Sequence, residues 1–308
     1  MYSKVARNIR RKRLKQGYNT VMSQDPSSHP PQHIDDIHTK LISRVEFAAK
    51  RGTEFSAEVR KWGNDHPVSL SGEIADDRLS YKVILNFSQQ PNLDDWGRTF
   101  GDAMHNLRSV LNNMVAEIAL AEGATKEQIK GVQFPVALTA KQWRSEKRRI
   151  QALPLTVQAA IEKVQPFTEM PQSPEQHPLA ILSALSNQDK HRLELTPAIE
   201  PLQLAHNTSI EFEEVPDPSV LQQVMNRMVI DGRFQDGVEV ITHDTTPYRI
   251  ERLIGYHQYH GRVQVVTDED VTLSPAEVMN AVFPAVTNII DGVLYAWANG
   301  AKPPKDDK

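Results

Sequence analysis

The sequence predicts an α+β protein dominated by a helical bundle, with a small antiparallel sheet and a long C-terminal helix. Apolar residues recur at helical spacing over 35–62 and again over 96–122. After about residue 200 the pattern changes to short segments rich in β-branched residues, separated by turn dipeptides. An apolar stripe at helical spacing then runs to Trp297, which indicates one continuous closing helix.

Start and stop signals place the elements of the first 200 residues. Gly123 ends the second long helix, and alternation of apolar and polar residues between the two long helices indicates a strand over 81–87. Thr125 with Gln128, and Thr139 with Gln142, match the capping pattern that opens a helix. The expected helices cover 35–62, 96–122, 156–165 and 179–185, with two short helices starting at Thr125 and Thr139.

The remaining elements follow from turn and capping signals. Asp231-Gly232 and Asp236-Gly237 are turn dipeptides that favour antiparallel pairing of the flanking strands. Ser274-Pro275-Ala276-Glu277 is a capping box with proline at the first helical position, and Gly300 ends the helix that it opens. The expected strands cover 209–215, 228–230, 238–241 and 263–267.

These elements suggest one domain with an appended arm. Proline-rich residues after position 22 read as a linker, because proline blocks helix and nothing apolar is available there to bury. The predicted organisation is a basic arm and proline-rich linker over 1–33, a single α+β domain over 34–300 and a tail over 301–308. Within that domain we expect a helical part over 34–200, a β-rich part over 201–272 and a closing helix over 273–300.

Composition narrows the class of protein. The 308 residues contain no cysteine, which excludes a disulfide framework and thiolate metal sites and suits the cytoplasm. No apolar run approaches the roughly 20 residues of a membrane span, so no membrane contact is expected. Residues 1–20 carry a charge of +7, and since the total is −4, the other 288 residues sum to −11. A nucleic-acid footprint on the body of the protein must therefore be local.

The helix over 96–122 is the most informative segment, because one of its faces is polar without the usual Lys and Glu. Asn, His, Ser and Asp cost about half a kcal/mol relative to Ala inside a helix. A sequence that gathers them on one face is expected to contact a second subunit, another helix or a ligand. The face consists of Asp102, His105, Asn106, Arg108, Ser109, Asn112 and Asn113.

This polar face offers chemistry for a phosphate ligand. His105 supplies an imidazole that titrates near neutral pH, and Arg108 supplies a guanidinium fork suited to phosphate or carboxylate. The alternative is a buried hydrogen-bond network that fixes helix packing or a dimer. Both interpretations stay open on the residues alone.

A second polar cluster follows the helix over 179–185. Asp189, Lys190 and His191 are consecutive, and they matter for function only if the fold sets them against the first face. We expect them to share one region with His105 and Arg108. A weaker third candidate pairs His257 with His260, but a third ligand at a telling spacing is missing, so neither a metal nor another cofactor is predicted. The chain also lacks phosphate-loop, Gly-x-Gly-x-x-Gly and Gly-x-Ser-x-Gly motifs.

Two of these motifs carry a resemblance. Gly101-Asp102-Ala103-Met104-His105-Asn106-Leu107-Arg108-Ser109 and the downstream Asn187-Gln188-Asp189-Lys190-His191-Arg192 resemble an uncharacterised bacterial family, common in actinobacteria, over about residues 35–200. Its members carry Gly-Asp-x-x-His-Asn-Leu-Arg-Ser-x-Leu-Asp-His in the helix.

The family's helix motif, Arg followed five positions later by His, is similar to that of higher eukaryotes and prokaryotes nucleotide-binding (HEPN) domains. Those are helical bundles that often dimerise, and many are metal-independent ribonucleases of toxin or defence systems. Arg108 matches the arginine, but Asn113 stands where the family has histidine, and an amide cannot transfer a proton.

Three functional hypotheses follow from the residues and the resemblance. The first is a cytoplasmic homodimer, paired through the helix over 96–122, that binds RNA or a nucleotide without catalysis through Asp102, Arg108, Asn112, Asn113, Asp189 and Lys190. The second is a metal-independent HEPN-like endoribonuclease with His105 and His191 as its proton-transfer residues. The third is a structural or interaction protein without a ligand.

Overall fold

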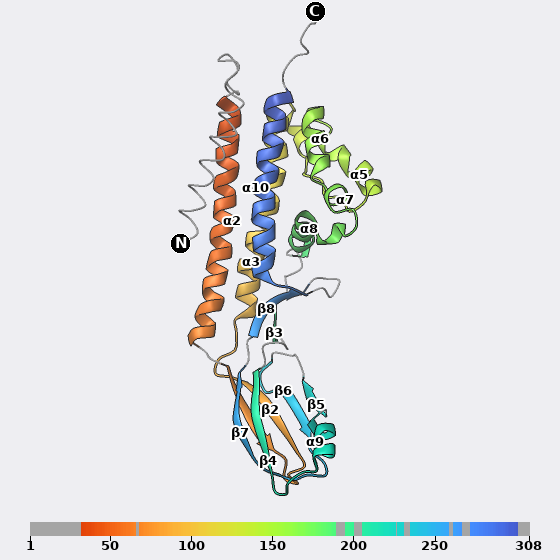
Figure 1. The fold of residues 1–308 in the computed structure, drawn as a ribbon. Coiled ribbons are helices and arrows are strands. Elements are labelled where there is room, and N and C mark those ends of the chain that lie inside the picture. Colours follow the sequence, from red (N-terminus) through yellow and green to blue (C-terminus); the bar gives the residue numbers. More distant parts are fainter. Residues whose placement is uncertain are drawn as a thin grey trace, which may run out of the picture.

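The fold is that of a computed structural model that describes residues 32–65, 68–188, 195–199, 205–225, 227–230, 235–258, 261–266 and 272–300. The predicted arm up to residue 31 and the predicted tail lie outside these residues. An α+β architecture dominated by helices, with small antiparallel sheets and a long C-terminal helix, is confirmed (Figure 1).

Three long helices lie side by side and form the upper part of the molecule in Figure 1. They are α2 (Gln32–Asp65), α3 (Leu93–Ala121) and α10 (Pro275–Gly300). α3 begins three residues earlier than predicted, because the side chain of Asn92 accepts a hydrogen bond from the Asp95 backbone N–H and caps the helix. α2 continues through Gly52, where a Cβ atom would lie 2.6 Å from Met279 Sδ, so the missing side chain lets α2 and α10 approach closely.

Short helices pack beside α3 and α10. The predicted caps are confirmed, since the Thr125 and Thr139 side chains accept from the Gln128 and Gln142 backbone N–H groups. These elements are α4 (Lys126–Ile129), α5 (Ala140–Glu146), the 3₁₀ turn η2 (Lys147–Ile150), α6 (Leu155–Lys163), α7 (Pro166–Glu169), η3 (Pro174–Gln176) and α8 (Pro178–Gln188).

The β-rich part extends from one end of the helical bundle (Figure 1). One sheet has the order β1-β2-β6-β5, made of β1 (Val68–Ile74), β2 (Ser80–Phe87), β6 (Glu239–Asp244) and β5 (Met228–Ile230). A second has the order β3-β8-β9, made of β3 (Leu195–Ile199), β8 (Gly261–Val266) and β9 (Thr272–Leu273). β4 (Ala205–Phe212) pairs with β7 (Ile250–Gln258), and α9 (Pro218–Met225) lies between β4 and β5 in sequence. All the described pairs are antiparallel.

Several of these elements differ from the prediction. β1, β3, β7 and α9 were not expected, and β1 and β2 belong to the β-rich part although they lie between the two long helices in sequence. β1 escapes prediction because it is a sheet edge with mostly exposed side chains, so its sequence lacks a clear apolar alternation. The expected strands over 228–230 and 238–241 are found as β5 and β6, and Gly237, with a φ of +74°, makes the turn that precedes β6.

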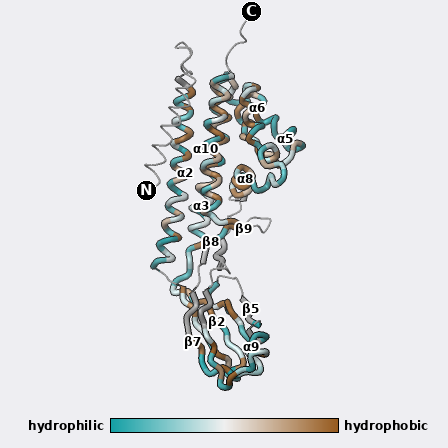
Figure 2. Tube along the Cα trace, in the orientation of Figure 1, coloured by the Kyte–Doolittle hydropathy of each residue, from teal (hydrophilic) through white to brown (hydrophobic). Residues whose placement is uncertain are grey.

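One face of the closing helix α10 belongs to the core. By length and composition this helix could cross a membrane, but the core helix of a soluble protein passes the same test, so it is weak evidence for a membrane span. Figure 2 shows hydrophobic positions recurring along α10. The helix packs against α2, α6 and α8, and its residues Val282, Val286, Ile290 and Val293 are fully buried.

Candidate functional site

Two polar side chains of α3 hold the backbone of one buried residue. Arg108 Nη2 donates a hydrogen bond of 2.6 Å to the carbonyl of Phe134, and Asn112 Oδ1 accepts one of 3.0 Å from the N–H of the same residue. Arg108 and Asn112 are one turn apart, so both lie on the flank of α3 that faces this segment. Of the two interpretations of the polar face, a phosphate site or a hydrogen-bond network that fixes packing, the contacts of Asn112 support the second.

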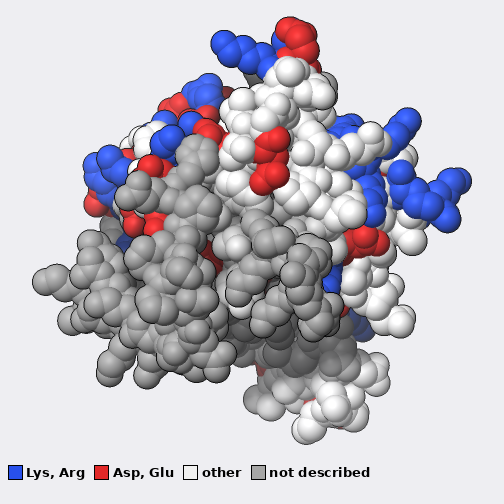
Figure 3. Space-filling model, turned by 90° about the horizontal axis from the view of Figure 1, so that it is seen from above, with Lys and Arg blue, Asp and Glu red and all other residues white. Residues whose placement is uncertain are grey.

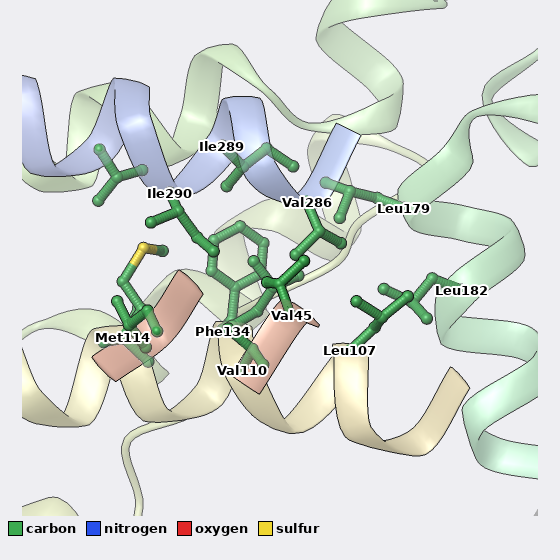
Figure 4. Close-up of a cluster of buried hydrophobic side chains, with 14 of the residues drawn as sticks. Val45, Leu107, Val110, Met114, Phe134, Leu179, Leu182, Val286, Ile289 and Ile290 are labelled. Atoms are coloured by element: carbon green, nitrogen blue, oxygen red, sulfur yellow. The ribbon is translucent and has the colours of Figure 1, made fainter. Parts of the chain in front are cut away.

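The held segment is anchored in the core. The Phe134 ring is fully buried between α3 and α10, against Val110 and Val286 (Figure 4). The fully buried amide of Gln165 accepts from the Ala137 N–H at 2.9 Å and donates to the Pro135 carbonyl at 3.1 Å. The segment that follows Gln133 belongs to no strand, so its backbone N–H and carbonyl groups have no β-ladder partners. The hydrogen bonds from side chains take their place and hold the segment.

Arg108 is electrostatically unsatisfied. The pKa of its guanidinium is lowered to about 10, mainly by burial and also by the positive charge of Arg149, against the opposing effect of the Glu146 carboxylate. The group therefore remains charged at neutral pH. Its Nη1 atom is buried and has no hydrogen-bond partner within the described part of the chain. The guanidinium carbon lies 6.0 Å from the centre of the Phe134 ring, a weak compensation for a buried charge.

Asn113 lies on the other flank of α3. Asn113 comes five positions after Arg108, which places the two side chains about 140° apart around the helix. Asn113 and Glu117 line a groove of about 390 Å³ with Lys40 and Arg44 of α2. Within one chain, Arg108 and the position that departs from the HEPN pattern therefore face different neighbours.

Exposed residues occupy the surface between these flanks. His105 and Asp102 are exposed, and Asp102 accepts a hydrogen bond of 3.2 Å from Arg51 of α2. Phe47, between Arg44 and Arg51 on the same side of α2, is 55% exposed. The antiparallel helices α2 and α3 thus form a polar face with one exposed aromatic ring in it.

The second predicted cluster, Asp189, Lys190 and His191, lies outside the described residues, so its convergence with His105 and Arg108 stays a prediction. The backbone of His257 pairs with that of His206 in the β4–β7 ladder, and His260 is outside the described ranges. Among described residues, no group of three His, Cys, Asp or Glu is arranged to hold a metal ion.

A basic segment beside Arg108 was missed by the sequence reasoning. α5 and η2 carry five cations, which are Lys141, Arg144, Lys147, Arg148 and Arg149. Blue side chains gather on the right of Figure 3, the side on which Figure 1 places α5 and α6. The run Lys-Gln-Trp-Arg-Ser-Glu-Lys-Arg-Arg could have revealed it, but the segment was interpreted only as a capped helix.

Arg149 links this segment to the α3 site. It donates to the side chain of Gln133, next to Phe134, and its Nε atom lies 2.8 Å from the Glu146 carboxylate. Arg108 and Arg149 therefore approach the same short segment from two sides.

Comparisons with protein-family models, with curated proteins and with solved structures find no match.

Proposed function

We propose that the protein is a cytoplasmic binding protein that holds a phosphate group of RNA or of a nucleotide at Arg108 and Arg149, without cleaving it. One observation carries the proposal: a buried guanidinium with an unpaired nitrogen lies beside a second cation. The described residues include no carboxylate in direct ion-pair contact with Arg108, because Glu146 pairs with Arg149. A buried charge without a direct partner is costly, and two adjacent cations repel. An anion that reaches Nη1 offsets both costs, and phosphate offers several acceptor oxygens to a guanidinium fork.

The absence of catalysis rests on the candidate proton-transfer groups. Asn113 cannot transfer a proton and faces the α2 groove rather than Arg108. His105 is exposed and makes no hydrogen bond to a described residue that would orient its ring. The ribonuclease alternative would need His191 to supply the second proton-transfer group. The alternative of a purely structural face gains support from Asn112, whose side chain serves the Phe134 backbone.

Arg108→Gln tests this proposal, because glutamine keeps a polar amide at this position but carries no charge. We expect binding of a fluorescent mixed-sequence RNA or of ATP at low salt to weaken by roughly 1.5 to 3 kcal/mol, the value of a hydrogen bond to a charged group. Arg51→Gln, which removes a cation already paired with Asp102, is the control and should bind like the wild type.

The same RNA should stay intact in EDTA. Cleavage that disappears in His105→Ala would promote the ribonuclease alternative. Wild-type protein that binds neither RNA nor ATP at low salt would remove the proposal.

Homodimerisation is part of the proposal, through the α2–α3 face that carries Phe47. The exposed ring of Phe47 is flanked by Arg44 and Arg51, and aromatic residues and arginine are enriched at the centres of interfaces. Light scattering at tens of micromolar should give twice the mass of the 34.8 kDa chain, and Phe47→Glu should give the monomer mass. A wild-type monomer would contradict the dimer. Asn112→Lys is unsuitable for this test, because it would break the Phe134 bond.

A further inference from the structure

Three cations on α5 and η2 form an exposed stripe. Lys141, Arg144 and Arg148 recur at intervals of three and four residues, which places them on one side of the helix and its 3₁₀ extension. All three are exposed, and none forms an ion pair with a described residue. The other two cations of this segment do form ion pairs. Lys147 Nζ lies 3.6 Å from the Glu162 carboxylate, and Arg149 Nε lies 2.8 Å from the Glu146 carboxylate. We call Lys141, Arg144 and Arg148 the basic stripe.

The basic stripe continues into the Arg108 site. Arg148 and Arg149 are adjacent in η2, Arg149 donates to Gln133, and Arg108 donates to the carbonyl of Phe134. The stripe and Arg108 are therefore linked through Arg149 and the Gln133–Phe134 segment, and we call Lys141, Arg144, Arg148, Arg149 and Arg108 together the track. The seven-residue rise from Lys141 to Arg148 spans on the order of 10 Å, which is longer than one phosphate group.

We infer that the ligand of this site is a nucleic-acid strand whose backbone phosphates follow the basic stripe to Arg108, rather than a mononucleotide. The inference rests on the proposed function, and it names the ligand class. A mononucleotide calls for a concave site with apolar walls around its base. The stripe is instead an exposed helix surface with cations in a row, which suits contacts to successive phosphates.

The track should not read sequence. Trp143, the aromatic residue of α5, is only 4% exposed and packs against Phe167, with ring centres 6.2 Å apart. Its ring is therefore not available for stacking on bases, which is how proteins commonly hold single strands. Binding should depend on phosphate contacts and hence on salt, with little dependence on base identity.

The test replaces all three stripe residues by glutamine, in the variant Lys141→Gln, Arg144→Gln, Arg148→Gln. A matched control replaces three exposed cations of α2, in the variant Lys50→Gln, Arg60→Gln, Lys61→Gln. Binding of labelled 20-residue oligouridylate, oligoadenylate and oligothymidylate is measured by fluorescence anisotropy over a salt series, with ATP as the mononucleotide probe. Circular dichroism checks folding, and the single variant Arg144→Gln replaces the triple one if that variant melts early.

We expect the stripe variant to bind oligouridylate and oligoadenylate at least tenfold more weakly than the wild type. The slope of log affinity against log salt should fall by about 2, because each lost phosphate contact removes about 0.7 for a single strand. The α2 control should keep the wild-type affinity and slope. ATP binding should change less than twofold. The affinity for oligothymidylate shows whether a DNA strand is bound through its phosphodiester backbone in the same way as an RNA strand.

Three outcomes would overturn the inference. In the first, the stripe variant binds the strands with wild-type affinity and slope while Arg108→Gln does not, so the proposed function survives alone. In the second, polyglutamate competes with oligouridylate as well as unlabelled RNA does, which would identify an acidic protein as the partner. In the third, the wild type binds no strand at low salt, and the proposed function is then judged by ATP alone.

Discussion

Gln165→Leu should lower the free energy of unfolding by about 2 to 6 kcal/mol. The side-chain amide is fully buried and bonds to the Ala137 N–H, the Pro135 carbonyl and, at 3.1 Å, the Ile161 carbonyl. Leucine has a similar volume but leaves the N–H of Ala137 and the carbonyl of Pro135 without partners. Each buried backbone group left unsatisfied costs about 1 to 3 kcal/mol. Chemical denaturation followed by circular dichroism measures the loss.

Gln158→Leu is the control for this variant. Gln158 is also a buried glutamine of the α6 region, but its described side-chain bond is a single one, from Nε2 to the Leu153 carbonyl at 2.8 Å. Its loss should therefore be about 1 to 3 kcal/mol. Equal losses in the two variants would show that Gln165 is not the special anchor of residues 135–137.

Phe134→Ala should destabilise the protein by about 3 to 5 kcal/mol, the usual cost of removing a buried phenylalanine ring. The ring is fully buried between the helices that form the core, and the backbone of the same residue holds Arg108 and Asn112 (Figure 4). Phe134→Leu keeps most of the volume and should cost clearly less. Thermal denaturation of both variants, compared with the wild type, measures the difference.

Binding distinguishes the two functions of Phe134. At a temperature where Phe134→Ala is still folded, the carbonyl that Arg108 contacts is no longer anchored by a buried ring, so RNA affinity should fall in this variant more than in Phe134→Leu. A destabilised but fully binding Phe134→Ala protein would show that the held segment serves packing alone.

Long periodic segments were predicted well because each carries its own signal. The helices α2, α3 and α10 repeat their apolar positions over many turns, and the caps at Thr125 and Thr139 are local patterns. β1 and β7 depend on neighbours that are distant in sequence, so their own residues say little about pairing. The positions of the helices could therefore be predicted from the sequence better than the pairing of the strands.

The sequence pointed to the polar face of α3 but not to its contacts. Which of its residues bond to the protein interior and which face solvent depends on the segment around Phe134, which packs against α3 only in the fold. The repulsion between Arg108 and Arg149 likewise exists only in three dimensions, since the two residues lie on different elements. Charge density over 141–149 was visible in the sequence and was overlooked.

The pairing of β2 with β6 has a consequence for synthesis on the ribosome. Lys82 of β2 bonds at 3.0 Å to Glu239 of β6, and 157 positions separate them. At about 5 to 20 residues per second, β2 waits on the order of 10 to 30 s for its inner neighbour. During that interval Val83 and Leu85, buried in the finished sheet, lack their cover, and an open strand edge invites pairing with other chains. The nascent β1–β2 hairpin is therefore the segment that a ribosome-associated chaperone would have to shield.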